Sequence, residues 1–290
     1  MNDQRAHQTT PARAAGTDLS TPLRAEIGVI GGSGLYEFLT DAVAVEVDTP
    51  YGPPSDRLVI GEVAGRRVAF VPRHGADHRW PPHRIPYRAN LWALRSLGVG
   101  QVLAPCAVGS LRHDRPIGSL VIPDQVIDRT SGRVGTFYDG PPAGVVHVGF
   151  ADPYCPVGRA AATRAAAAAG WAPFGDGTLV VIEGPRFSSR AESAWYAAGG
   201  ASIIGMTGQP EATLARELAL CYTTLALVTD LDAGIETGSG VTMAEVFAIF
   251  AKNVARLRDL LFAVIGALPD ERRCPCPATL DGLRTGIVLP

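Results

Sequence analysis

The chain has 290 residues, of which 47% are hydrophobic and 19% charged, and its formal net charge is −2 at pH 7. This composition is typical of a folded protein with a packed core and excludes a largely disordered chain. The slightly acidic balance argues against a nucleic-acid partner, and no apolar run approaches the roughly 20 residues of a transmembrane helix, so we expect no membrane partner either.

The two ends of the chain differ from its middle. Residues 1–25 lack hydrophobic periodicity and the apolar segment of a secretory signal, which predicts a flexible extension. Residues 26–268 run without a linker and are expected to fold as one domain. Residues 269–290 are rich in proline, glycine and charge, which predicts a C-terminal tail.

The cysteines are scattered through apolar and loop contexts, at Cys106, Cys155, Cys221, Cys274 and Cys276. An odd number without regular spacing indicates reduced thiols and therefore a cytoplasmic protein. The pair Cys274 and Cys276 is also compatible with a metal site or a disulfide. Because no second ligand pair follows it, we expect a mobile tail there and no metal.

The middle of the chain alternates short strands with helices. Strands are predicted at 27–30, 57–60, 67–71, 101–107, 119–122, 145–148, 178–182, 202–205 and 222–228. Helices are predicted at 87–97, 160–169, 189–198, 210–220 and 243–267. The last of these begins with a possible capping box, Thr242 with Glu245. This alternation predicts an α/β domain with a central mixed β-sheet, where ligands bind at the carboxyl ends of strands.

A glycine-rich turn, Gly31-Gly32-Ser33-Gly34, follows the first predicted strand. Glycines let the backbone approach an anion closely, and the Ser33 hydroxyl adds a donor, so the turn suits phosphate. A dinucleotide-binding turn is the alternative, but the third glycine of that pattern is replaced by Glu37. The turn alone is also compatible with no ligand at all.

Arg73 and His74 directly follow the strand predicted at 67–71. Arginine offers a fixed fork of donors to an oxyanion, and a histidine ring can donate from either nitrogen. His78 and His83 extend the cluster, but their spacing on a proline-rich loop does not define metal-ligand geometry. We therefore expect an anion site here and no metal site.

Two further strand ends carry candidate ligand contacts. Phe187 lies between a strand and a helix, where it could stack on a flat ring or pack in the core. Thr207 precedes a helix that begins near Pro210, so its hydroxyl and the helix N-terminus suit an anion. Met206 offers a soft apolar surface for a sugar.

Asp230 and Asp232 close the strand predicted at 222–228. If the chain stays extended, side chains two residues apart point the same way. Two carboxylates at a strand end suggest acid–base chemistry or metal binding, and the lack of a third acidic ligand nearby favours acid–base chemistry. A turn or capping role remains the structural alternative for either residue.

These motifs together resemble the 5′-methylthioadenosine phosphorylase and purine nucleoside phosphorylase family, in the same order, from about Ile27 to about Pro269. The matching segments are GVIGGSGLY (28–36), TPYGPPSD (49–56), PRHG (72–75), YRANLWAL (87–94), DRTSGR (128–133), EGPRFSSRAES (183–193), GMTGQPEA (205–212) and TDLDAG (229–234). The resemblance implies one α/β domain, a homotrimer, and a phosphorolytic enzyme of purine and methionine salvage. It implies inorganic phosphate as co-substrate and no other cofactor.

The resemblance also assigns roles to individual residues. Phosphate would be bound by Ser33, Arg73, His74, Cys106, Ala107 and Thr207. The nucleoside would be bound by Phe187, Ser188, Met206 and Met243, with His147 closing the 5′ end of a neighbouring subunit's site. Cys106 departs from the family, because many relatives carry a threonine there and so supply a hydroxyl that this chain lacks.

Asp230 and Asp232 are the residues implied to read the base and carry its proton. Relatives acting on 6-oxopurines carry asparagine at the position of Asp230, whereas those acting on 6-aminopurines carry aspartate. An ionised carboxylate only accepts hydrogen bonds, so it suits a 6-amino group. The two aspartates therefore favour an adenine base, and the family resemblance then implies phosphorolysis of 5′-methylthioadenosine to adenine and 5-methylthioribose 1-phosphate.

Other functions remain open at this point. A purine nucleoside phosphorylase of broader or 6-oxopurine specificity is the main alternative, since the sequence does not decide between a 5′-methylthio and a 5′-hydroxyl group. A water-using nucleoside hydrolase would release the base without phosphate. A non-enzymatic binding module on the same fold would not need Asp230.

Overall fold

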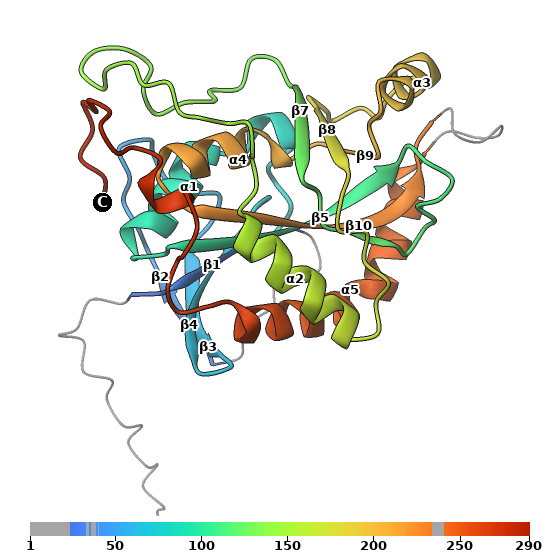
Figure 1. The fold of residues 1–290 in the computed structure, drawn as a ribbon, viewed down its shortest axis with the longest axis horizontal. Coiled ribbons are helices and arrows are strands. Elements are labelled where there is room, and N and C mark those ends of the chain that lie inside the picture. Colours follow the sequence, from blue (N-terminus) through green and yellow to red (C-terminus); the bar gives the residue numbers. More distant parts are fainter. Residues whose placement is uncertain (1–23, 33–34, 36–38, 40, 234–240) are drawn as a thin grey trace, which may run out of the picture.

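The computed structural model describes residues 24–32, 35, 39, 41–233 and 241–290, and Figure 1 shows their arrangement. The strands are β1 (Ile27–Gly31), β2 (Val43–Val45), β3 (Leu58–Val63), β4 (Arg66–Pro72), β5 (Gln101–Ser110), β6 (Leu120–Val121), β7 (Gln125–Arg129), β8 (Thr178–Ile182), β9 (Ile203–Gly205) and β10 (Cys221–Leu231). The helices are α1 (Tyr87–Ser96), α2 (Pro156–Ala168), α3 (Arg190–Ala198), α4 (Gly208–Glu217) and α5 (Met243–Ala267), with short 3-10 turns η1 (Pro82–Arg84) and η2 (Cys276–Ala278).

All ten strands belong to one mixed sheet, whose main path runs β2-β3-β4-β1-β5-β9-β8-β7. The long strand β5 is its centre: it pairs in parallel with β1 and β10 and antiparallel with β9. Because β4, β1, β5 and β10 run in the same direction, their carboxyl ends meet at one edge of the sheet. The predicted α/β class with a central mixed sheet is confirmed.

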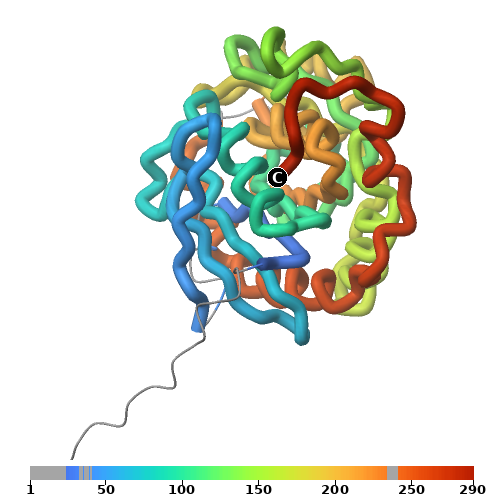
Figure 2. Tube along the Cα trace, turned by 90° about the vertical axis from the view of Figure 1, so that its left-hand side faces the viewer, coloured from blue at the N-terminus to red at the C-terminus, as the bar shows by residue number. Residues whose placement is uncertain are grey.

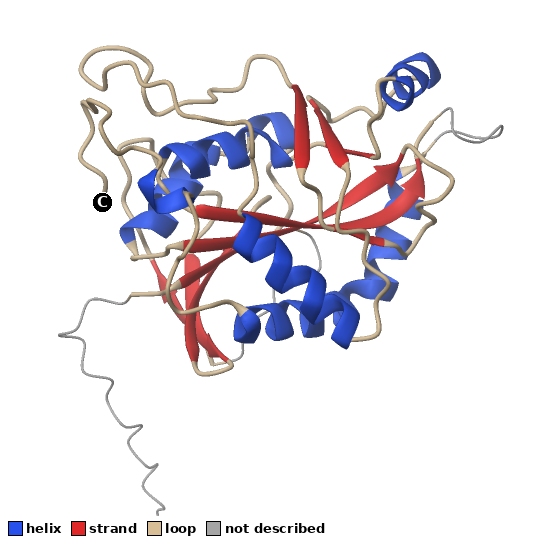
Figure 3. Ribbon diagram, in the orientation of Figure 1, coloured by secondary structure: helices blue, strands red, loops and turns tan. Residues whose placement is uncertain are grey.

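Helices cover both faces of the sheet (Figures 1 and 3). On one face α1 and α4 pack around buried residues that include Leu91, Trp92 and Leu214. On the other face α2 and α5 pack around Ala162, Leu257 and Leu261. Burying large apolar side chains stabilises such a core by about 1.5–3 kcal/mol each. Among the described residues no helix is both long and apolar enough to cross a bilayer.

Local signals explain where the helices begin. The capping box predicted at the start of α5 is present, with the Thr242 hydroxyl accepting from the Glu245 N–H. A second box, formed by Ser189 and Glu192, starts α3. Gly170, with φ of 75°, follows the end of α2, where the sequence placed the end of that helix.

Two expectations differ from the structure. The strand predicted at 145–148 is not present: these residues form an irregular loop, and Val145 is 67% exposed. The segment 269–290 packs along the molecule, as the red trace in Figure 2 shows, although a mobile tail was expected. Gln101 donates to the Pro269 carbonyl, Cys276 is buried, and the Gly286 N–H donates to the Ala143 carbonyl.

Candidate active site

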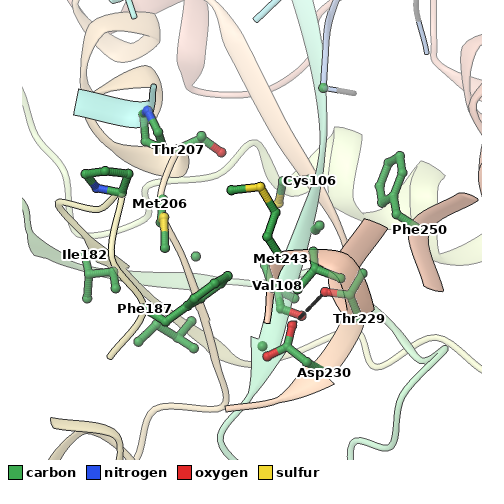
Figure 4. Close-up of a pocket in the computed structure, with 18 of the residues that line it drawn as sticks. Cys106, Val108, Ile182, Phe187, Met206, Thr207, Thr229, Asp230, Met243 and Phe250 are labelled. Atoms are coloured by element: carbon green, nitrogen blue, oxygen red, sulfur yellow. Dashed lines mark hydrogen bonds between the residues drawn. The ribbon is translucent and has the colours of Figure 1, made fainter. Parts of the chain in front are cut away.

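A cavity opens where the carboxyl ends of β1, β4, β5 and β10 meet, and Figure 4 shows the side chains that line it. The residues after β8 and β9 close it from the side, and the first turns of α5 lie across it. Of the residues singled out in the sequence, the following line the cavity: Arg73, His74, Cys106, Ala107, Phe187, Ser188, Met206, Thr207, Asp230, Asp232 and Met243.

Two singled-out residues are not placed there. Ser33 lies outside the described residues, although its neighbour Gly32 lines the cavity and a Cβ on Gly32 would stand 3.7 Å from Nη1 of Arg73. His147 is exposed on the loop after β7 and does not line the cavity of its own chain.

Arg73 is held by a buried carboxylate that sequence reasoning missed. Its Nε and Nη2 donate to the two oxygens of Glu211 at 2.6 and 3.0 Å, and its Nη1 donates to the Pro105 carbonyl. The two side chains are only 2% and 1% exposed, and Tyr222 adds a third hydrogen bond to Glu211. Three of the five N–H groups of the guanidinium are therefore used for positioning, which leaves two for a ligand.

His74 is fixed as a neutral ring. Its Nδ1 lies 2.8 Å from the Trp80 carbonyl, which can only accept, so Nδ1 carries the hydrogen and Nε2 has a free lone pair. Burial, with the positive charge of Arg73 and the neighbouring His78, lowers the pKa of His74 to about 4. The His78 ring stacks on it at 4.6 Å. Nε2 of the neutral His74 ring can accept a hydrogen bond from a protonated oxygen of a bound oxyanion.

Cys106, Ala107 and Thr207 line the same cavity as Arg73. Thr207 is the N-cap residue of α4 but makes no capping hydrogen bond, so its hydroxyl is not used by the helix. Gln209 of α4 has non-helical φ and ψ, so the regular turns of this helix begin only after it and the backbone at Thr207 is not a regular helix N-terminus. Burial raises the pKa of Cys106 to about 12, so this residue stays a neutral thiol.

Asp230 and Asp232 lie on one side of the sheet, beside Gly109 of β5. A Cβ on Gly109 would stand 2.8 Å from Oδ1 of Asp230 and 3.2 Å from the Cβ of Asp232. The register of β10 against β5 shifts between Val228 and Asp230, which is a β-bulge with Thr229 as the extra residue. The bulge and the missing side chain at Gly109 together make room for both carboxylates.

The two carboxyls have different partners. The Thr229 hydroxyl donates to Oδ2 of Asp230 at 2.8 Å, and the Ser193 hydroxyl of α3 donates to Oδ2 of Asp232. Burial is the main cause that raises the pKa of Asp230 to about 6, with Asp232 nearby adding to it. Burial also raises the pKa of Asp232, against the lowering effect of Ser193.

The rest of the cavity is largely apolar. Phe187 and Met206 point into it from the ends of β8 and β9 (Figure 4). Met243, Val246, Phe247 and Phe250 of α5 line a further part. An aromatic face beside a carboxylate pair suits a flat, hydrogen-bonding ring.

Arg133, 3% exposed, is a second positioning group that sequence reasoning did not assign. It donates to the carbonyls of Glu183, Met206 and Gln209 and forms an ion pair with Glu183. It thereby ties the ends of β8 and β9 together. No local sequence pattern indicates the contacts of Arg133 or of Glu211, because the residues they bind are at least 50 positions away in the sequence.

A family model described as the phosphorylase superfamily matches residues 26–266. The purine nucleoside phosphorylase of Streptomyces coelicolor is 61% identical, covering 94% of this chain and 100% of that protein. The S-methyl-5′-thioadenosine phosphorylase of Mycolicibacterium smegmatis is 55% identical, covering 91% and 99%.

Solved structures agree with the fold. A methylthioadenosine phosphorylase from an antarctic soil metagenomic library has a TM-score of 0.83 at 43% identity, covering 89% of this chain and 92% of that one. The Schistosoma mansoni methylthioadenosine phosphorylase in complex with adenine has a TM-score of 0.82 at 36% identity, covering 86% and 93%.

Proposed function

The chain belongs to the phosphorylase superfamily, and from this premise we propose that it cleaves 5′-methylthioadenosine with inorganic phosphate, releasing adenine and 5-methylthioribose 1-phosphate. The observation that carries the substrate class is the pair of half-buried Asp230 and buried Asp232, which line one cavity together with Phe187 and Arg73. Relatives in the same size range act as nucleoside phosphorylases, which makes the chain a pentosyltransferase.

In this proposal phosphate binds at the Arg73 end of the cavity. Two guanidinium N–H groups remain available there, and Gly32, Ala107 and the Thr207 hydroxyl line the same region. Because Glu211 neutralises Arg73, the anion depends on hydrogen bonds as well as on the arginine charge. Neutral His74 would accept the hydrogen of a monoprotonated phosphate.

The nucleoside occupies the remaining space, with the base at the aspartates. Phe187 would stack on the purine, Met206 would contact the ribose, and Ser188 lies buried at the same end. A 6-amino group donates hydrogen bonds, and ionised Asp232 can accept one. A 6-oxo group would face this carboxylate with its own lone pairs.

The reaction follows from these positions. A phosphate oxygen attacks C1′ of the ribose while the bond from C1′ to N9 breaks, and the electron pair of that bond enters the purine. The phosphate anion stabilises the positive charge that develops on the sugar. Asp230 gives its proton to N7, so adenine leaves as a neutral molecule. A carboxyl with a pKa of about 6 can hold that proton near neutral pH.

The part of the cavity lined by α5, where the 5′ group of the ribose would lie, favours the methylthio substrate. Met243, Val246, Phe247 and Phe250 present apolar surface, which suits a methylthio group more than a hydroxyl. The similarity to the Streptomyces coelicolor purine nucleoside phosphorylase favours a second candidate, a purine nucleoside phosphorylase of broader specificity.

We further propose that the chain works without a cofactor, in the cytoplasm, as a homotrimer. The trimer rests on the family resemblance, and His147, which is exposed and does not line the cavity of its own chain, is accessible to a neighbouring subunit. In the trimer His147 would contact the 5′ group of a substrate bound in a neighbouring subunit's cavity.

A substrate panel at saturating phosphate tests the proposal. We expect kcat/KM for methylthioadenosine to exceed that for adenosine, and both to exceed the values for methylthioinosine and inosine by about ten- to hundredfold, since an unpaired buried polar group costs about 1–3 kcal/mol. Equal or greater use of inosine would replace the proposal with the second candidate.

A further inference from the structure

Four of the five cysteines meet on the side of the molecule away from the cavity. Cys155, Cys221, Cys274 and Cys276 each offer one sulfur, and the four sulfurs all lie within 4.8 Å of one another. Three of these residues are at most 3% exposed, and Cys274 is half-buried. None of them lines the cavity. The nucleoside reaction leaves this cluster without a role.

The four sulfurs come from three separate segments. Cys155 is the N-cap of α2, Cys221 is the first residue of β10, and Cys274 and Cys276 belong to the C-terminal segment. The cluster is therefore formed only when the chain has folded and the C-terminal segment has docked beside α2 (Figure 2). The pair that seemed to lack a second ligand pair in the sequence finds it 53 and more residues upstream.

We propose that these four cysteines form a structural zinc site, a tetrahedral tetrathiolate that fastens the C-terminal segment to the sheet. In such a site Zn–S bonds of about 2.3 Å place the sulfurs roughly 3.8 Å apart. A tetrahedral site requires every sulfur to lie close to the other three, and the four sulfurs here do so. Two disulfides would require only that the sulfurs lie close together in pairs. All five cysteines are free thiols in the structure.

The surroundings suit thiolates. The Gly158 N–H donates to Sγ of Cys155 at 3.4 Å, at the positive N-terminal end of α2. The guanidinium of Arg272 donates to the carbonyls of Gly100 and Ala219, and the Cys221 N–H donates to the same Gly100 carbonyl. A cation and a helix N-terminus thus flank a site that would carry negative charge. Soft sulfur ligands in tetrahedral arrangement select zinc over hard cations.

The site is far from the chemistry. Cys221 and Asp230 stand nine positions apart along β10, a span of about 30 Å at roughly 3.3 Å per residue. The proposal is therefore independent of the proposed reaction, and the two can fail separately. Zinc here would hold structure and take no part in nucleoside cleavage.

Elemental analysis of the full chain, purified without a metal-binding tag from zinc-containing medium, tests the site. We expect about one zinc per chain in the wild type and in the control Cys106→Ser, whose cysteine lies outside the cluster. Cys155→Ser, Cys276→Ser and the half-buried Cys274→Ser should lose most of the zinc. The Cys274 variant keeps the test valid if the buried variants fail to fold.

Thiol alkylation with mass spectrometry provides the second readout. We expect five alkylated cysteines after unfolding with a chelator. In the native protein half-buried Cys274 should be protected until the zinc is removed, whereas buried Cys106 should stay protected with or without zinc. A wild type without zinc, iron in its place, zinc retained in both Cys274→Ser and Cys276→Ser, or two disulfides in the freshly purified chain would each overturn the proposal. Phosphorolysis measured on the same samples reports on the proposed function separately.

Discussion

Asp230 combines two properties that a proton donor needs: it faces the cavity, and burial holds its pKa at about 6. The Thr229 hydroxyl, which donates to the same carboxyl, opposes that shift. Because Asp230 is a carboxylic acid with a pKa of about 6, its protonated form predominates below about pH 6 and declines above it. The ring of His74 stays uncharged on both sides of this midpoint, at pH values well above 4, since its own pKa is lowered to about 4.

The pH profile should show this proton. We expect kcat/KM for methylthioadenosine, measured with phosphate saturating at every pH, to fall about tenfold per pH unit once the pH is well above 6. Steady-state rates from pH 5 to 9 measure it. A profile that stays flat or rises across pH 6 to 8 would contradict the assignment of Asp230 as the donor.

Replacing that carboxyl should change which base is preferred. Asp230→Asn removes the proton that is passed to N7 and places an amide N–H donor beside the neighbouring 6-position, where a 6-oxo group can accept it and a 6-amino group cannot. We therefore expect the ratio of kcat/KM for methylthioadenosine to that for methylthioinosine to fall by about ten- to hundredfold. The same variant should lose the decline above pH 6. An unchanged substrate ratio would show that Asp230 does not read the base.

Cys106 is the weak point of the phosphate site, because a buried neutral thiol donates poorly. Cys106→Thr adds a hydroxyl at this position, and a hydrogen bond to a charged group contributes about 1.5–3 kcal/mol, so the KM for phosphate should fall by about tenfold or more. Cys106→Val, matched in shape but without the hydroxyl, is the control. Equal phosphate KM values for the two variants would remove Cys106 from the phosphate contacts.

At the scale of elements, the pairing of β5 with β10 places the acid pair. Gly109→Ala would put a methyl group 2.8 Å from Oδ1 of Asp230. We expect kcat/KM for the nucleoside to fall by about a hundredfold, since small displacements of catalytic groups cost that much, with the phosphate KM nearly unchanged. Gly175→Ala, whose Cβ would meet only ordinary contacts at 3.7 Å, should behave as the wild type.

Periodicity and capping signals predicted most elements near the site, and their limits have physical causes. The bounds of α5 and β8 match the predictions because a capping box and a compact apolar run mark them. The apolar alternation at 145–148 predicts a strand that has no partner strand, so the segment stays a loop. The strands β2 and β7 are mostly exposed at the two edges of the sheet and carry a weaker apolar signal.

At the scale of the whole molecule, the sequence predicted which residues follow strands, and the parallel order of β4, β1, β5 and β10 brings their ends together. It could not predict the ion pair of Arg73 with Glu211, because that contact joins residues 138 positions apart. It could not predict the docked C-terminal segment either. Proline, glycine and charge there resemble a free tail until Cys276 and Pro269 are seen against the body of the protein.

The central claim is that phosphate, and not water, is the nucleophile that attacks C1′ of the ribose. The most direct test incubates the purified enzyme with methylthioadenosine in phosphate-free buffer and again with added phosphate, and follows adenine and sugar products together. The account predicts adenine and 5-methylthioribose 1-phosphate in equal amounts, formed only when phosphate is present. Adenine released at the same rate without phosphate, together with free methylthioribose, would contradict it.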